Sequence, residues 1–235
     1  MSSPATQPHP NAPDLAGVVP VAWRPYVDLP ALRNVEDFLG GEVAAGRKIQ
    51  PLRAQVFRAL ELVAPAKVRV VLCGQDPYPG LGVPMGMAFS VPPDAPVPES
   101  LKNLFTELQA DLGITPPPTG DLTPWAAHGM LLLNASLTVR PGEPGSHNGA
   151  KWPAVTLELL RRLASEREGI VFLALGRAAQ NVIGKLPLDG HRVVEAAHPS
   201  PMSVAAFRGS RIFSRTDAAL AELGQPAFDW RFGTG

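Results

Sequence analysis

The feature that most restricts the fold is an alternation of short apolar segments with helical patterns. The apolar segments are rich in β-branched and aliphatic side chains, and each runs into a polar or Gly- and Pro-rich loop. They cover 67–73, 130–135, 170–175 and 191–196, and apolar side chains recur at helical spacing over 32–45, 52–62, 100–113, 152–166 and 176–185. Short apolar strands that alternate with helices indicate a parallel sheet buried on both faces. We therefore expect a single α/β domain in which a mostly parallel, four-stranded twisted sheet carries helices on both faces.

The extent of the domain follows from length and from the composition of the N-terminus. The chain has 235 residues, 45% of them hydrophobic, which suffices for a single domain with a sizeable core. Residues 1–20 are rich in Pro, Ser and Ala, which predicts a flexible tail ahead of a domain at 21–235, with order beginning near Trp23. No apolar run reaches the roughly 20 residues that cross a bilayer, and no secretory signal is visible. The single cysteine, Cys73, allows no internal disulfide, which fits the reducing cytosol. Together, these observations lead us to expect a cytoplasmic protein without a membrane partner.

The balance of charge argues against one class of function. The 21 basic and 21 acidic residues give a formal net charge of zero. Proteins that coat DNA non-specifically gain affinity from many phosphate contacts, so a neutral chain is a poor candidate for that class. A neutral total still allows an enzyme with a local basic rim.

Polar side chains follow the predicted strands at the points where the strands end. Gln75 and Asp76 come after the first strand, and Asn134 closes the second. Arg177 follows the third strand and His198 follows the fourth. In parallel sheets, ligands bind outside the carboxyl ends of the strands. The sequence therefore predicts an active site at this edge of the sheet.

Five motifs carry a resemblance to a known enzyme family. They are GQDPYPG (74–80), MAFSV (87–91), VPESLKNLF (97–105), LLLNASLTVR (131–140) and HPSPMS (198–203). In this order they resemble the family-1 uracil-DNA glycosylases, and the resemblance runs from about Trp23 to Phe232. It implies an enzyme that flips uracil out of single- or double-stranded DNA and hydrolyses the N-glycosidic bond, leaving an abasic site for base-excision repair. It also implies a monomer without metal or cofactor, and a protein inhibitor as a further partner.

The resemblance gives catalytic roles to two residues, Asp76 and His198. Glycosidic hydrolysis builds positive charge on the sugar, which a carboxylate such as Asp76 stabilises while it orients the attacking water. The departing uracil becomes an anion, and an imidazole N–H of His198 would donate to its O2. Without the motifs, Asp76 reads equally well as a loop residue that caps its own turn before Pro77, and His198 as a solvated side chain.

Four residues are expected to read the base. The amide of Asn134 offers a donor and an acceptor that match O4 and N3–H of uracil, whereas cytosine presents the reverse pattern. By resemblance, Tyr78 fills the space that a thymine methyl would need and Phe89 stacks on the flipped ring. Gln75 would add hydrogen bonds to the base. Both aromatic residues could instead be ordinary core residues.

The expected contacts to the DNA backbone and stack come from a third group. Met202 stands where the family usually carries a leucine that wedges into the stack, and methionine fills that space with a more flexible side chain. The resemblance assigns phosphate contacts to three serines, and nearby arginines could form a basic rim. This group comprises Ser100, Ser200, Ser203, Met202, Arg177 and Arg208.

Three positions depart from the family pattern. The family's water-activating loop commonly ends in His where this chain has Pro79, although some bacterial members carry Pro there. Glu99 replaces a residue that is usually neutral, and a carboxylate near phosphates is unfavourable. Arg177 replaces a common Ser, which exchanges a hydrogen bond for a charge-assisted phosphate contact. These changes concern efficiency and DNA affinity more than the type of reaction.

Three other functions compete with uracil excision as interpretations of the sequence. A related glycosylase could prefer another lesion, but Asn134, Tyr78 and Phe89 favour uracil. A non-catalytic DNA-binding relative would need neither Asp76 nor His198. A nucleotide-phosphate hydrolase would need a GxxxxGK[ST] loop or a carboxylate cluster for magnesium, and the sequence has neither.

Overall fold

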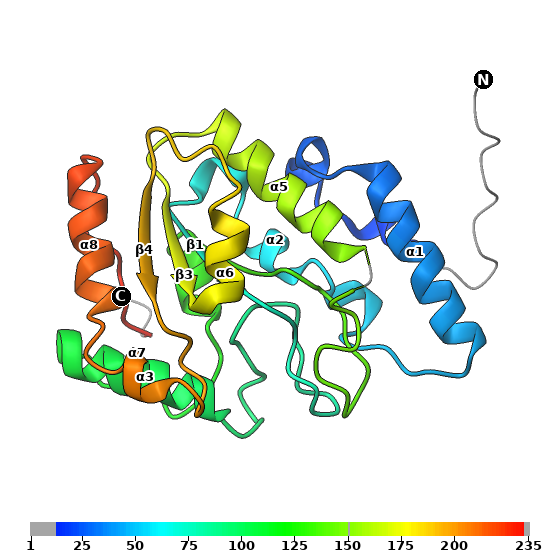
Figure 1. The fold of residues 1–235 in the computed structure, drawn as a ribbon, viewed down its shortest axis with the longest axis horizontal. Coiled ribbons are helices and arrows are strands. Elements are labelled where there is room, and N and C mark those ends of the chain that lie inside the picture. Colours follow the sequence, from blue (N-terminus) through cyan, green and yellow to red (C-terminus); the bar gives the residue numbers. More distant parts are fainter. Residues whose placement is uncertain (1–12, 150, 233–235) are drawn as a thin grey trace.

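A four-stranded sheet forms the centre of the fold in a computed structural model, which describes residues 13–149 and 151–232. The strands are β1 (Val70–Gly74), β2 (Met130–Asn134), β3 (Val171–Leu175) and β4 (Arg192–Ala196). Their order is β2-β1-β3-β4, and every pair is parallel. The predicted α/β class is therefore confirmed, with a sheet that is parallel throughout rather than mostly parallel (Figure 1).

Burial of the strands follows their place in the sheet. β1, β2 and β3 are buried at every position, as their continuous apolar sequences require. β2 lies at an edge but is covered, because the N–H of Ala88 donates to the carbonyl of Leu132 at 2.9 Å. β4 forms the other edge and exposes Arg192 and Glu195, charged residues that are typical of an edge strand.

Helices cover both faces of the sheet, as the alternating pattern predicts. Those between and after the strands are α3 (Glu99–Leu112), α4 (Thr123–Ala127), α5 (Trp152–Glu166), α6 (Gly176–Ile183), α7 (Val204–Phe207) and α8 (Ile212–Glu222). α1 (Leu29–Ala44) and α2 (Arg58–Leu62) precede β1, with short 3-10 turns at Ala16–Val18, Val21–Tyr26, Arg53–Gln55 and Pro65–Lys67. In Figure 1, α8 lies on one side of β3 and β4 while α5 and α6 lie on the other.

Tertiary contacts changed one predicted helix. The pattern at 52–62 predicts one helix, but the structure has a 3-10 turn followed by α2 from Arg58. The backbone at Gly86 packs against this segment so closely that a Cβ there would lie 1.7 Å from the carbonyl oxygen of Gln55. The N–H of Ala59 donates to the carbonyl of Gly86 rather than continuing a helix from 52. A non-local hydrogen bond therefore overrides the local helical pattern.

The packed part of the chain begins earlier than the expected boundary near Trp23. Leu15 and Val19 are buried in the core, and the N–H groups of Leu15 and Ala16 donate to the carboxylate of Glu36 on α1. Residues 1–12 of the predicted tail lie outside the described residues. Over the described ranges, no helix has both the length and the apolar character to span a membrane.

Candidate active site

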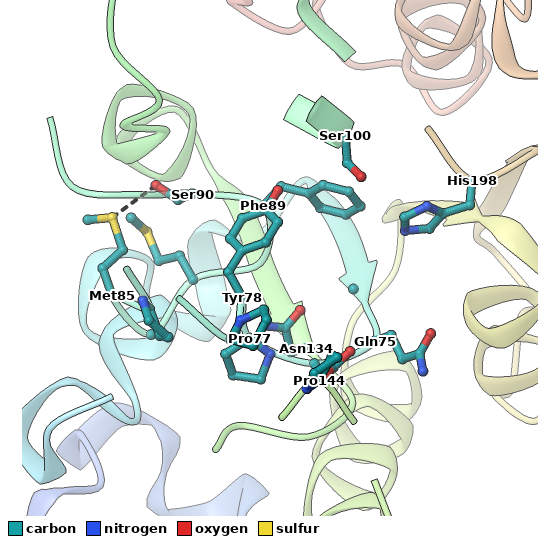
Figure 2. A pocket seen from close by; sticks show the side chains of 16 residues that line it. Gln75, Pro77, Tyr78, Met85, Phe89, Ser90, Ser100, Asn134, Pro144 and His198 are labelled. Carbon is teal, nitrogen blue, oxygen red and sulfur yellow. Dashed lines mark hydrogen bonds between the residues drawn. The ribbon is translucent and has the colours of Figure 1, made fainter. Parts of the chain in front are cut away.

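The carboxyl ends of β1, β2 and β4 meet around a cavity of about 160 Å³. Loops 74–79 and 84–90 form most of its wall, and α3 and the loop after β2 close it. The register of the sheet explains this convergence, because Gly74 of β1 lies beside Asn134 of β2. The sequence-predicted residues that line the cavity are Gln75, Asp76, Tyr78, Phe89, Ser100, Asn134 and His198 (Figure 2).

Asp76 is half-buried, and a distant loop holds its carboxylate. Oδ2 accepts a hydrogen bond from the backbone N–H of Gly145 at 2.7 Å, 69 residues further along the chain. Burial raises the pKa of Asp76 above its ordinary value, and the Gly145 N–H opposes part of that rise. Because the carboxylate is held across the cavity, Asp76 does not act as a local turn cap before Pro77. Oδ1 has no hydrogen-bond partner within the described residues and can meet a ligand.

The loop that carries Asp76 is held from outside the cavity by Gln50. The Gln50 Nε2 donates to the carbonyl oxygens of Pro79 at 3.1 Å and Gly80 at 2.9 Å, and its Oε1 accepts from the Gly82 N–H at 3.2 Å. The N–H of Gly142 donates to the same Pro79 carbonyl at 2.8 Å. The backbone at Pro79 is therefore fixed by hydrogen bonds from Gln50 and Gly142. The family commonly has His at this position, whereas Pro79 has no titratable side chain.

His198 is placed as a neutral hydrogen-bond donor. Its Nδ1 accepts from the backbone N–H of Ser200 at 3.0 Å, so the proton of the neutral ring sits on Nε2. Burial lowers the pKa of His198 below its ordinary value, which keeps the ring neutral at pH 7. The backbone around it is anchored, because Ser203 Oγ donates to the His198 carbonyl at 2.7 Å and Asn103 Nδ2 donates to the Pro199 carbonyl at 2.8 Å.

Phe89 lies against His198 in a strained backbone conformation. Its φ is +62°, a value rare for residues with a side chain, and such strain costs roughly 1–3 kcal/mol. Hydrogen bonds from the N–H groups of Ala88 and Val91 to neighbouring carbonyls hold the segment on either side. The Phe89 and His198 ring centroids are 5.6 Å apart with planes at 31°, and Figure 2 shows Phe89 between Tyr78 and His198. The strain therefore fixes an aromatic face inside the cavity.

Asn134 and Tyr78 present polar groups that the protein leaves unpaired. Asn134 is only 7% exposed as a residue, and its amide, which lines the open cavity, has no hydrogen-bond partner within the described residues. The Tyr78 hydroxyl is also buried without a partner in that part of the chain, and burial raises its pKa. An unpaired buried polar group costs about 1–3 kcal/mol, so such a group in a cavity points to a ligand that pairs it.

Two glycines make room for the functional side chains. A Cβ at Gly74 would lie 2.1 Å from Oδ1 of Asn134, and one at Gly176 would lie 2.8 Å from the Cβ of His198. Gly176 also has φ +84°, which disfavours any other residue. The sequence reasoning missed these glycines together with Gln50 and Gly145. The three glycines carry no side-chain signal, since their contribution is space or a backbone N–H, and the Gln50 side chain acts on a loop about 30 residues further along the chain, which no local pattern indicates.

Gln75 lines the cavity only at its edge, and the remaining predicted residues lie outside it. Gln75 has an exposed side chain, and Met202 is almost fully exposed at 99%. Arg177 and Arg208 are exposed, do not line the cavity and make no ion pair with any described residue. The hydroxyls of Ser200 and Ser203 lie 3.0 Å apart beside His198.

One departure from the family pattern is compensated locally. Glu99 forms an ion pair with Lys102 at 2.6 Å in the first turn of α3. Both side chains are exposed, so the pair contributes little to stability, but it cancels the negative charge next to Ser100.

Among the described residues, no three His, Cys, Asp or Glu side chains lie together in a way that could hold a metal ion.

Comparisons with known proteins agree with this geometry. Residues 61–223 match the model of the uracil DNA glycosylase superfamily. A uracil-DNA glycosylase of Mycolicibacterium gilvum is 46% identical over 83% of this chain and 86% of its own, and one of Coxiella burnetii is 44% identical over 86% and 88%. The crystal structure of mimivirus uracil-DNA glycosylase matches with a TM-score of 0.85 at 26% identity, over 94% of this chain and 90% of the viral chain. This chain belongs to the uracil-DNA glycosylase superfamily.

Proposed function

We propose that the cavity receives a uracil base flipped out of DNA, and that the chain hydrolyses its N-glycosidic bond. The chain is then a hydrolase of DNA repair that leaves an abasic site, an activity that the curated relatives at 44–46% identity support. One observation carries the proposal beyond family membership. A half-buried carboxylate, a neutral imidazole with a free N–H and an unpaired amide all face the same cavity.

Asp76 and His198 would divide the chemistry between them. As the bond between the sugar C1′ and uracil N1 breaks, positive charge develops on the sugar and negative charge on the base. The Asp76 carboxylate stabilises the sugar cation and orients the water that adds to C1′. The Nε2–H of His198 donates to uracil O2, which stabilises the departing anion. The water supplies the hydroxyl of the sugar product, and its proton ends on solvent or on the released base.

The same cavity accounts for base selection. The Asn134 amide would pair O4 and N3–H of uracil, which satisfies a group that the protein leaves unpaired. Tyr78 would occupy the space beside C5 and exclude a thymine methyl. The fixed Phe89 ring would stack on the base, a contact worth roughly 1–3 kcal/mol. Gln75 is exposed at the edge and would use its backbone or side chain there.

The DNA would bind along the rim formed by the loop after β4 and the start of α3. Met202, which is fully available to solvent, would fill the gap that the flipped base leaves. Ser100, Ser200 and Ser203 would approach phosphates on either side. The unpaired cations of Arg177 and Arg208 would add local positive charge to a chain whose formal net charge is zero.

The GQDPYP sequence of the catalytic loop defines the variant of the family. With Pro79 in place of a histidine, water activation falls to Asp76 alone, and Gln50 holds the loop backbone. Uracil-containing DNA, single- or double-stranded, is the partner we assign. The crystal structure of a mimivirus UNG variant in complex with UGI matches this chain with a TM-score of 0.87 at 25% identity, which supports an inhibitor protein as a second partner. A monomer in the cytoplasm completes the proposal.

Release of free uracil from DNA tests this function directly. The purified chain, incubated with a uracil-containing oligonucleotide and a chelator of divalent metals, is expected to produce uracil and alkali-labile abasic sites. The matched oligonucleotide with thymine in place of uracil serves as the control. The function proposal would be falsified if no uracil formed, or if other lesions were released faster from a panel of modified oligonucleotides.

Asn134→Asp is expected to weaken the preference for uracil and to permit some excision of cytosine. A protonated aspartic acid or a carboxylate can accept from the exocyclic amine of cytosine, where the wild-type amide presents a mismatched pattern. The ratio of single-turnover rates on uracil and cytosine oligonucleotides measures the effect. An unchanged ratio contradicts the assigned base reading, and Asn34→Asp, at an exposed position of α1 outside the cavity lining, controls for charge alone.

A further inference from the structure

A buried charge cluster lies outside the cavity and has no part in the chemistry described so far. Glu42 on α1 is only 5% exposed, and its carboxylate accepts from Arg47 Nη1 at 2.6 Å and from Nε and Nη2 of Arg140. The hydrogen bonds from Arg140 hold the pKa of Glu42 at about 2. The carboxylate is therefore charged at every pH at which the enzyme works. Burying such charges costs desolvation free energy, so we expect the cluster to fix the position of a particular part of the structure.

The cluster binds one end of the 140–147 loop and lies beside the other. Arg140 begins the 140–147 loop and forms the ion pair with Glu42. His147 ends the loop, is 1% exposed, and lies beside the same carboxylate, with Nε2 3.6 Å from Oε2, a separation too long for a hydrogen bond. On its other side, His147 Nδ1 lies 2.8 Å from Oγ1 of Thr138. One carboxylate on α1 therefore faces the first and the last residue of the loop.

Between these two ends the loop reaches the catalytic carboxylate. The N–H of Gly145 donates to Asp76 Oδ2 at 2.7 Å, and the neighbouring Pro144 lines the cavity. The loop is also braced internally, since the Arg140 N–H donates to Ser146 Oγ at 2.8 Å. No side chain of the loop touches Asp76 in these contacts, so the loop acts on Asp76 through one backbone N–H. The position of that N–H depends on how the loop ends are fixed.

We propose that Glu42 is a positioning residue for Asp76: through its ion pair with Arg140 it holds the 140–147 loop so that the Gly145 N–H donates to the catalytic carboxylate. The inference rests on the catalytic role proposed for Asp76. Without the buried anion, Arg140 loses its anchor at the start of the loop, and the N–H moves away from Asp76. The ionised carboxylate then loses a donor that stabilises it, and it is less well placed to orient water.

Glu42→Gln tests the proposal, because it keeps the shape of the side chain and removes the charge. The single-turnover rate of uracil release is expected to fall about 10-fold or more, since a displacement of about 1 Å in a catalytic group can cost 10²-fold. The acid limb of the pH–rate profile is expected to shift to higher pH, because the charged form of Asp76 is stabilised less. Tyr78 and His198 are the other titratable groups that line the cavity, and Glu42→Gln leaves both unchanged. Affinity for uracil-containing DNA should stay within 2-fold.

A matched control uses the second partner of the same arginine. Arg140 Nη1 also pairs with Glu143, which is 59% exposed, so Glu143→Gln removes an equal charge from the loop without touching the buried anchor. Its rate and acid limb should match the wild type. Glu42→Asp restores the charge and is expected to recover part of the rate and of the pH profile.

Three outcomes overturn the proposal: a folded Glu42→Gln with normal rate, a rate loss without a shift of the acid limb, or an equal effect of Glu143→Gln. If Glu42→Gln does not fold, Arg140→Lys decides, because lysine keeps the charge but cannot bridge the carboxylate with two N–H groups. A rate loss with a shifted acid limb in that variant supports the proposal, and normal behaviour overturns it. Asp76→Asn, assayed in parallel, separates a failure of the positioning role of Glu42 from a failure of the catalytic role of Asp76. If that variant were active, the catalytic role of Asp76 itself would be wrong.

Discussion

Asp76→Asn is expected to lower the single-turnover rate of uracil release by roughly 10²–10⁴-fold or more, while uracil-containing DNA still binds. The substitution keeps the size of the side chain and an oxygen that can accept from Gly145, but removes the negative charge. Charge is what the sugar cation requires in the transition state, whereas the ground-state complex requires only shape and hydrogen bonds. The loss should therefore fall on the chemical step and leave the dissociation constant almost unchanged.

The stability of the same variant separates a catalytic loss from a folding defect. Burial raises the pKa of Asp76 in the folded state above its unfolded value near 3.8. The favourable contribution of this carboxyl group to the free energy of unfolding is therefore fully present below pH 3.8, and it is lost as pH rises through the higher folded-state pKa. At pH 7 the ionised carboxylate thus destabilises the fold, and Asp76→Asn should raise the thermal midpoint or leave it unchanged. Asp94→Asn, at an exposed loop position, should change neither the rate nor the midpoint. Near-normal turnover of Asp76→Asn would show that another group stabilises the sugar.

His198→Leu is expected to cost a similar factor of roughly 10²–10⁴ in the chemical step. The imidazole donates through Nε2–H because Nδ1 is occupied by the Ser200 N–H, and leucine removes that donor while filling the space. The lowered pKa of His198 means that a neutral donor acts at pH 7, so the rate should not fall as pH rises from 6.5 to 8. Single-turnover rates measured over that range check this point.

A substrate with a better leaving group distinguishes the role of His198 from a general loss of structure. Fluorine at C5 of uracil withdraws electrons and stabilises the departing anion, so the base needs less help from His198. The deficit of His198→Leu should therefore be smaller on 5-fluorouracil DNA than on uracil DNA. A deficit of equal size on both substrates argues against leaving-group stabilisation. His128→Leu, a half-buried histidine outside the cavity lining, is the matched control and should behave as the wild type.

Much of the fold could be predicted because local sequence carries strong physical signals. Segments such as LLLNA and VFLAL are short, apolar and bounded by loops, and their alternation with helical patterns favours buried parallel strands joined by crossover helices. The helix at Ile212–Glu222 gave no such signal. It begins after Arg211, which has φ +53° and whose own side chain makes no cap; the first-turn N–H of Ser214 is capped instead by the Asp111 carboxylate of α3 at 2.8 Å, a partner far away in the sequence. Its usual start signal is therefore absent from the sequence.

The sequence by itself determined which side chains could do chemistry and that they meet where the strands end. Asp76, Asn134 and His198 stand at fixed offsets from buried strands, and a parallel sheet brings such positions to one edge. Only the tertiary structure decided what those side chains are bonded to. Three contacts join segments that lie far apart in the chain: the Gly145 N–H donates to Asp76, the Gln50 amide donates to the Pro79 carbonyl, and Glu42 pairs with Arg140. The physical reason is that backbone N–H and C=O groups are alike at almost every residue, and that no local pattern names the distant partner of a polar side chain, so each contact is set by where the folded chain places the two groups.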